Sequence, residues 1–229
     1  MISLINKSFS RGLLFIAVIR LRVDAKFKKD FLKIFERINL LSIKNYQYSD
    51  TIILAIISIE DKRFQNHCGV DIYAILRAFY RRLFYKKIEG GSTIEQQLVR
   101  TITERREITI RRKITEILLA VLLGKQYEKI EIINSYCCIY NFNDCTGIHA
   151  LCVKEHIDFK KASIQQASTI VARLKYPIIT STNYIRYLKR VRTIEIITSE
   201  LLVNSHYNKC LKGKESQFKP LIQKPKSAA

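Results

Sequence analysis

Three polar stretches organise this chain: EDKRFQNHCG at residues 60–69, GGSTIEQQLVR at residues 90–100 and RRKITE at residues 111–116. Each stretch follows or opens a segment whose apolar spacing predicts a helix. Acidic residues stand at both ends of the region, with a glycine- and amide-rich turn and several cations between them. This order predicts a site that handles an anionic group together with a proton transfer.

Composition limits the class of protein. The 229 residues predict one domain, or one domain with appendages, and the 48% hydrophobic content is ample for a core. The balance of 40 Lys and Arg against 20 Asp and Glu gives a net charge of +20 and predicts an anionic partner, such as nucleic acid, lipid headgroups or a phosphorylated substrate. The mean hydropathy of -0.03 excludes a polytopic membrane protein.

The six cysteines lack the regular spacing of a disulfide framework, so we expect reduced and mostly buried thiols. One set has helical spacing and could line one face of a helix: Cys145, His149, Cys152 and His156. Structural zinc sites usually draw their ligands from two elements, and Gly147 is expected to begin a helix after Cys145. We therefore predict no metal site in the protein.

The N-terminal 48 residues are predicted to form a membrane-proximal segment. Its apolar run, residues 12–19, is too short to span a bilayer, which needs roughly 20 residues. One interpretation is a basic amphipathic segment on a membrane surface, in which Phe15 and Ile19 lie beside Arg11 and Arg20. The other is an ordinary core helix with solvated cations, and the sequence leaves both open.

Apolar periodicity predicts a mainly α-helical protein without a strand pair. The predicted helices cover residues 26–47, 51–59, 71–85, 104–123, 128–140, 147–156, 163–174 and 183–202. Helix 51–59 is apolar nearly all round, which predicts burial, and its cap is predicted at Ser49-Asp50. It carries Glu60 at its end.

Two of these helices have a defined apolar stripe. In helix 71–85 the stripe consists of Ile72, Ile75, Leu76, Phe79 and Leu83. In helix 104–123 we expect a buried face made of Ile110, Ile114, Ile117, Leu118 and Val121. Residues beyond 206 are rich in Lys, Pro, Gly, Ser and Gln and predict a basic disordered tail.

The candidate site residues each have a simpler interpretation. Glu60 is suited to general-base chemistry if desolvated, but an acid at a helix end is more often solvated or ion-paired. His67 alone is more often structural than catalytic. The turn before the helix at residue 94 offers phosphate or sugar donors on Ser92, Thr93, Gln96 and Gln97. Arg112, Lys113 and Glu116 share a helix face, where a plain salt-bridged surface is the alternative.

Together the stretches resemble the motifs of the peptidoglycan glycosyltransferases, the family 51 glycosyltransferases. The first motif, E-D-x-x-F-x-x-H-x-G, is matched at Glu60, Asp61, Phe64, His67 and Gly69. The next helix matches the pattern D-x-x-A-x-x-R-A, in which the arginine is Arg77. The second, G-G-S-T-I-x-Q-Q-L-V-K, is matched from residue 90, with Arg100 in place of the lysine. The third, R-K-x-x-E, is matched at Arg112, Lys113 and Glu116.

Some positions depart from the family pattern. Glu95 stands where the family usually has Thr or Ser, and Gly124 stands where Glu is common. Cys137-Cys138 occupies the Leu-Asn of a later motif. These departures keep a second hypothesis open, in which the chain is a catalytically weakened module of the same fold that binds lipid II or a partner. A third, a basic nucleic-acid binder, rests on net charge alone.

The resemblance implies a lysozyme-like helical large lobe with a smaller membrane-proximal jaw lobe. It also implies polymerisation of lipid II into β-1,4-linked glycan strands with release of undecaprenyl pyrophosphate. Glu60 would be the general base on the attacking 4-hydroxyl and Glu116 the second essential acid, on the donor side. Substrate would be bound by Asp61, Phe64, His67, Arg77, Ser92, Thr93, Gln96, Gln97, Arg100, Arg112 and Lys113.

The implied domain is residues 49–205, with the tail at 206–229. No Ser-x-x-Lys penicillin-binding centre follows residue 202, so we expect a monofunctional enzyme without a transpeptidase domain. No cofactor is required, although a divalent cation on the substrate's pyrophosphate remains an alternative. The expected partners are lipid II, the growing glycan, an anionic membrane surface, and cell-wall synthases or division proteins, but not nucleic acid. The expected location is the outer, periplasmic face of the bacterial cytoplasmic (inner) membrane.

Overall fold

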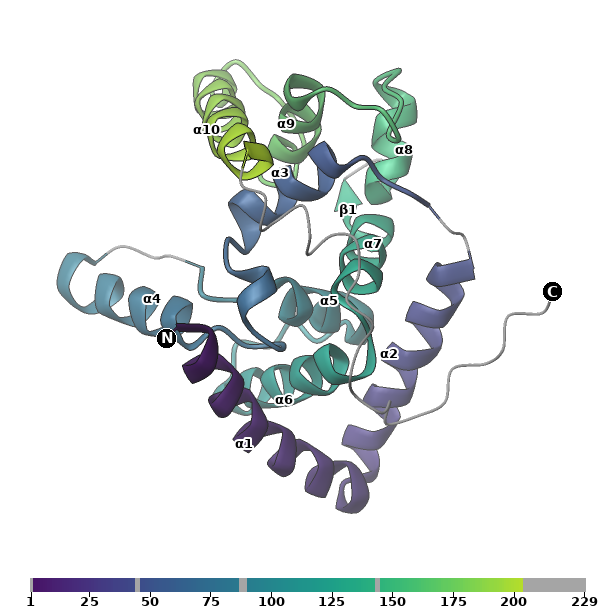
Figure 1. Ribbon diagram of the computed structural model, residues 1–229, viewed down its shortest axis with the longest axis vertical. Helices are drawn as coiled ribbons and strands as arrows, with labels where there is room; N and C mark the ends of the chain where they lie inside the picture. Colours follow the sequence, from purple (N-terminus) through teal and green to yellow (C-terminus); the bar gives the residue numbers. More distant parts are fainter. Residues whose placement is uncertain (1, 44–45, 87–89, 143–144, 204–229) are drawn as a thin grey trace. The chain divides into compact units, whose positions relative to one another are not determined.

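The computed structural model describes residues 2–43, 46–86, 90–142 and 145–203. Helices make up most of these residues, which confirms the predicted mainly α, lysozyme-like class (Figure 1). The chain divides into two compact units. Of the described residues, the first unit contains 2–40, 63–86 and 90–132, and the second contains 41–43, 46–62, 133–142 and 145–203. The predicted tail at 206–229 lies outside the described residues.

The first unit is built around α6 (Ile110–Gln126), against which α1 (Ile2–Val23) and α5 (Ile94–Thr103) pack. α2 (Ala25–Ile43) adds the buried stripe Phe27, Phe31, Ile34 and Ile38, at the spacing that predicted it. A 3-10 turn, η1 (Phe64–Asn66), and α4 (Ile72–Tyr85) complete the unit, and α7 (Lys129–Ile139) begins in it.

α1 and α2 meet at an angle at Asp24 (Figure 1). The Asp24 carboxylate accepts a hydrogen bond from the backbone N–H of Phe27 at 2.9 Å and pairs with Arg20 at 3.0 Å. These interactions lower the pKa of Asp24, the backbone bond to Phe27 contributing most. An ionised carboxylate at this position caps the start of α2.

The second unit packs α9 (Ile164–Ala172) and α10 (Tyr184–Val203) around α3 (Asp50–Glu60). α3 is buried from Ile52 to Ser58, and Ser49 caps it by accepting from the backbone N–H of Ile52 at 3.4 Å. Both features were predicted. α8 (Gly147–Lys154) follows a two-residue antiparallel pair, β1 (Asn141–Phe142) with β2 (Cys145–Thr146). The prediction of no strand pair was wrong here, because two residues per strand are too few to show an alternating pattern.

The predicted helix 104–123 begins six residues late. Glu104 ends α5 with a left-handed backbone (φ 58°), and Thr109 caps α6 by accepting from the backbone N–H of Arg112. Its predicted buried face is also partly wrong. Leu118 and Val121 are buried, but Ile110 is 81% exposed and Ile114 is 50% exposed, because the described residues of the first unit leave the start of α6 uncovered.

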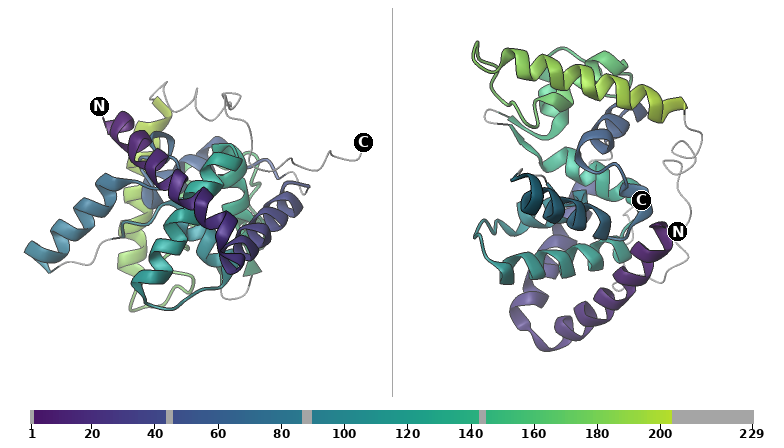
Figure 2. Two further views of the ribbon diagram at one scale, coloured as in Figure 1. Left: turned by 90° about the horizontal axis from the view of Figure 1, so that it is seen from below. Right: turned by 90° about the vertical axis from the view of Figure 1, so that its left-hand side faces the viewer.

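Two helices of the first unit expose apolar faces. α4 extends away from the rest of the unit and has no buried residue (Figures 1 and 2). Of its predicted apolar stripe, Leu76, Phe79 and Leu83 are exposed and Ile72 and Ile75 are half-buried. In α1 the usual arrangement of polar and apolar side chains is reversed, because the polar Asn6 and Ser10 are buried. The exposed, outward stripe consists of Ile5, Phe9, Phe15, Ile16, Ile19 and Val23. Among the described residues no helix is long and apolar enough to cross a membrane.

Candidate functional site

The centre of the first unit's polar cluster is the carboxylate of Glu116, which is buried on α6. One oxygen accepts a hydrogen bond from Arg112 at 2.5 Å, and the other accepts from Lys113 at 2.7 Å. The spacings of four and three residues bring both cations to the same helix face. The result is a buried acid with each of its oxygens paired to a cation.

Lys113 also links α6 to the start of α5. Its ammonium donates to the Ser92 hydroxyl at 2.8 Å and to the Gln96 side-chain oxygen at 2.7 Å. Burial lowers the pKa of Lys113, and Arg100 and Arg112 add to this, although Glu116 acts in the opposite direction. The second and third sequence stretches therefore share one cation.

The first stretch joins the same cluster through Gly69. Its carbonyl oxygen accepts from the Thr93 hydroxyl at 3.0 Å and from the Gln96 amide at 3.3 Å. Gly69 has a left-handed backbone (φ 80°), and an added Cβ would lie 2.2 Å from the Ala120 carbonyl oxygen on α6. Only glycine fits this close approach. Thr93 also caps α5, as predicted, by accepting from the backbone N–H of Gln96 at 3.3 Å.

A basic cavity of about 320 Å³ lies beside Arg112 in the first unit. Three carboxylates line it, and two of them are ion-paired there: Asp24 with Arg20, and Asp30 with Arg105 at 2.5 Å. The cations in the lining are Arg20, Lys26, Arg105, Arg111 and Arg112. An excess of cations over carboxylates suits a wall for an anionic group.

Glu60 lies in the second unit, where it ends α3 and is half-buried. Arg190 on α10 donates to its carboxylate at 3.2 Å. Sequence reasoning missed Arg190, because it is one of several cations on α10 and only the packing of α10 on α3 distinguishes it. Asp61 is buried, and its backbone N–H caps α3 by donating to the Ile57 carbonyl.

The remaining predicted substrate-binding residues differ in exposure. Phe64, His67 and Thr93 are buried, whereas Gln97 and Arg100 are half-buried and Arg77 is exposed on α4. Direct substrate contact by all of these residues remains a prediction. The structure brings together Ser92, Thr93, Gln96, Arg112, Lys113 and Glu116 in the first unit.

Cys137, Cys138, Cys152 and His149 pack within the second unit, whereas His156 is exposed. Cys137 and Cys152 are buried free thiols, and Cys138 lies 3.7 Å from the Tyr48 hydroxyl. The His149 ring stacks on the Tyr46 ring, with 4.4 Å between centroids. These contacts give the two residues of the later motif, Cys137-Cys138, a packing role.

Comparison with known proteins identifies the family. Residues 28–197 match the transglycosylase family. This chain belongs to that family. It is 38% identical over 97 residues to penicillin-binding protein 1B of Buchnera aphidicola, a match that covers 42% of this chain and 13% of that protein. It is 31% identical over 150 residues to a monofunctional glycosyltransferase of Staphylococcus epidermidis, covering 61% of this chain and 56% of that protein.

A penicillin-binding protein 1F of Bacillus subtilis is 33% identical over 128 residues, which is 54% of this chain and 18% of the relative. The matches thus span at most about half the length of these relatives. The motifs that carried the resemblance all lie within residues 28–197, the part of the chain that matches the family.

Proposed function

We propose that this transglycosylase polymerises lipid II into β-1,4-linked glycan strands and releases undecaprenyl pyrophosphate. The observation that carries the proposal is the cluster on α5 and α6, where Lys113 and Arg112 flank a buried Glu116. A pyrophosphate leaving group gains negative charge as the sugar bond breaks, and preorganised cations stabilise that charge. The family membership of the chain supports the same reaction.

In the proposed reaction Glu60 is the general base. It accepts the proton of the attacking 4-hydroxyl as that oxygen forms the new bond to the anomeric carbon of the donor sugar. The bond to pyrophosphate breaks in the same displacement, so the anomeric configuration inverts and no covalent enzyme intermediate forms. Arg190 pairs with the Glu60 carboxylate at 3.2 Å and is the cation that holds it in position.

Glu116 acts on the donor side in this scheme. Its carboxylate fixes the positions of Arg112 and Lys113, and these cations, with Arg100, hold the pyrophosphate. The basic cavity beside Arg112 extends the positive wall. We infer no protein-held cofactor, because side chains supply the positive charge; a divalent cation would bind the substrate's pyrophosphate instead.

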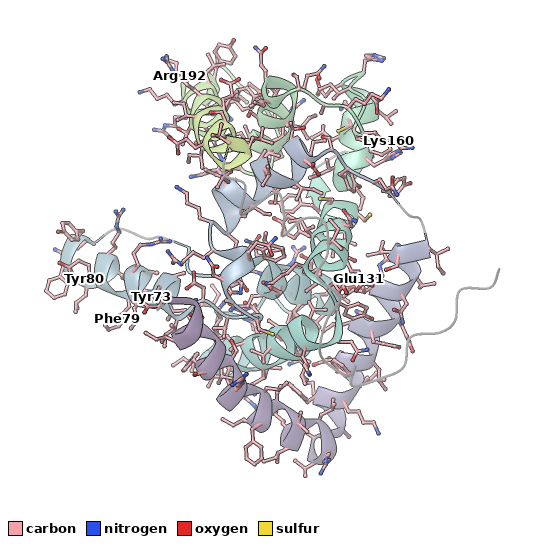
Figure 3. All side chains as sticks on the ribbon, viewed as in Figure 1. Tyr73, Phe79, Tyr80, Glu131, Lys160 and Arg192 are labelled. Atoms are coloured by element: carbon pink, nitrogen blue, oxygen red, sulfur yellow. The ribbon has the colours of Figure 1, made fainter. Side chains whose placement is uncertain are left out.

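The proposed location is the outer face of a bacterial cytoplasmic membrane. The support is the exposed apolar surface of the first unit: the outward stripe of α1, and on α4 the side chains of Leu76, Phe79, Tyr80, Leu83, Phe84 and Tyr85. Phe79 and Tyr80 project outward from α4 (Figure 3). Cations beside these faces, together with the net charge of +20, suit anionic lipid headgroups. Contacts with cell-wall synthases or division proteins remain predictions.

The proposal is tested by incubating the chain with labelled lipid II in detergent and separating the products. We expect polymer that a muramidase degrades to disaccharide units, with one undecaprenyl pyrophosphate released per bond formed. Lipid II that binds without polymer formation would instead favour the weakened binding module, for which the altered motif at Cys137-Cys138 is the motivation.

A further inference from the structure

A second buried acid, Glu95, lies in the first unit beside the site but has no role in the scheme above. It is fully buried in the first turn of α5, next in sequence to Gln96. One carboxylate oxygen accepts from Lys129 on α7 at 2.5 Å and lies 3.9 Å from the His67 ring nitrogen Nδ1. A buried charge of this kind persists only when it is paired.

Lys129 is the counterpart of Glu95 and reaches the first sequence stretch as well. Its ammonium lies 4.0 Å from the centroid of the Phe64 ring, a cation–π contact within the usual range. The Phe64 and His67 rings contact each other edge to face, with 6.3 Å between centroids. Glu95, Lys129, Phe64 and His67 therefore form one buried group, named here the Glu95 group, that joins α5, α7 and the turn η1.

On α6, Gly124 packs against the residues that follow His67 of this group. Gly124 faces Cys68, and an added Cβ there would lie 3.1 Å from the Cys68 sulfur and 3.1 Å from the Gly69 nitrogen.

We propose that Glu95 is a positioning residue, which acts through Lys129 and the first turn of α5 to hold Gln96 and Lys113 in place. The inference rests on the proposed function for its catalytic consequence. Glu95 and Gln96 share one helical turn: the first is held by Lys129, and the second holds Lys113 and the Gly69 carbonyl. Loss of the ion pair leaves the Lys129 charge uncompensated and shifts that turn.

The first experiment tests the ion pair between Glu95 and Lys129 through the reactivity of Cys68 and does not depend on enzyme activity. Burial raises the pKa of the Cys68 thiol, Glu95 acts in the same direction, and Lys129 and Lys125 act to lower it. In Glu95→Gln the raising effect of the Glu95 charge is lost while both cations remain, so Cys68 should alkylate at lower pH than in the wild type, measured peptide by peptide by mass spectrometry. The control is Glu104→Gln at the end of α5, which removes the exposed pair with Lys33 of α2 and should leave Cys68 unchanged.

The second arm reads positioning. In a Glu95→Thr variant that folds correctly, kcat for lipid II polymerisation should fall by about tenfold to a hundredfold, because a small displacement of a substrate-binding group lowers the rate by that much. Adding Lys129→Met removes the uncompensated charge and should restore part of kcat. A loss that reflects packing alone would deepen in the double variant.

Three results would overturn the inference. The first is a Cys68 profile that does not move in folded Glu95→Gln. The second is a folded Glu95→Thr variant with wild-type kcat. The third is a double variant worse than either single change. A wild type that does not polymerise lipid II would remove the proposed function and the catalytic consequence, while a Cys68 shift would still establish the ion pair.

Discussion

At the scale of single residues, the site depends on one lysine that contacts three partners. Lys113 donates to Ser92, Gln96 and Glu116 from a half-buried position, where burial lowers its pKa and two nearby arginines add to this. Its role is to hold negative charge that develops on the leaving group. Residue-scale tests therefore centre on the charge and the proton affinity of this side chain.

The lowered pKa of Lys113 predicts an alkaline limit to activity. A lysine loses its proton as pH rises through its pKa, so kcat should fall at a pH below 10.5, the ordinary lysine value. Lys113→Arg keeps the charge at every accessible pH, so the alkaline fall of kcat should move upward. Lys113→Gln should lower kcat by about 100- to 1000-fold at all pH values. An unchanged alkaline limb in folded, active Lys113→Arg would assign that limb to another group.

Alanine substitution at Gly69 and at Gly12 should change the free energy of unfolding in opposite directions. Gly69→Ala forces a Cβ against the Ala120 carbonyl in a left-handed backbone, and we expect a loss of more than about 2 kcal/mol in the free energy of unfolding. Gly12→Ala in α1 has open space around it and should gain about 0.5–1 kcal/mol. Urea unfolding of both variants checks the pair, and equal effects would contradict the close approach at Gly69.

At the scale of elements, the sequence predicted which helices exist better than which faces are covered. α2 follows from periodicity, because its stripe Phe27, Phe31, Ile34 and Ile38 is buried, and α3 follows from its apolar run and its serine cap. In α4 and at the start of α6 the periodicity is equally clear, but most of the apolar side chains are exposed. Periodicity reports an apolar stripe, and only tertiary packing decides what covers it. For the same reason the sequence did not indicate Arg190 as a site residue, since its partner Glu60 lies 130 positions away in the chain.

The outward faces of α1 and α4 predict insertion into a lipid interface. The chain contains no Trp, so Phe79→Trp or Phe15→Trp adds a single fluorophore to each face. On vesicles with anionic lipid, both should shift emission to the blue and be quenched by lipids brominated near the headgroup. Val153→Trp, at an exposed apolar position of α8, is the control and should remain unquenched. Unquenched emission from both reporters in the presence of bound vesicles would remove the membrane role of these helices.

At the scale of the whole molecule, charge and family are what the sequence predicts most firmly. The net charge of +20 predicts vesicle binding that weakens steeply with salt, because screening shortens the range of the attraction to anionic lipid. Sedimentation with anionic vesicles from low to high salt measures this. Binding that does not depend on salt, or that is equally strong on neutral vesicles, would contradict a role for net charge and assign vesicle binding to the apolar faces alone.

The three motifs were enough to predict the family, because their residue types and spacings occur together in order. The cluster around Glu116 could be predicted in part: the helical spacing joins it to Arg112 and Lys113, but the bonds of Lys113 to Ser92 and Gln96 need the packing of α5 on α6. The buried pairing of Glu95 with Lys129 could not be predicted, since nothing local links residues 34 positions apart.

The central claim is that two carboxylates, Glu60 and Glu116, carry glycan polymerisation. The most direct measurement is polymerisation of labelled lipid II by the wild type beside Glu60→Gln and Glu116→Gln, each checked for folding by circular dichroism and thermal unfolding. We predict polymer from the wild type, and losses of at least about 100-fold in both variants at unchanged fold. Substantial polymer from folded Glu60→Gln would contradict its assignment as the base. The same result from folded Glu116→Gln would contradict the donor-side role.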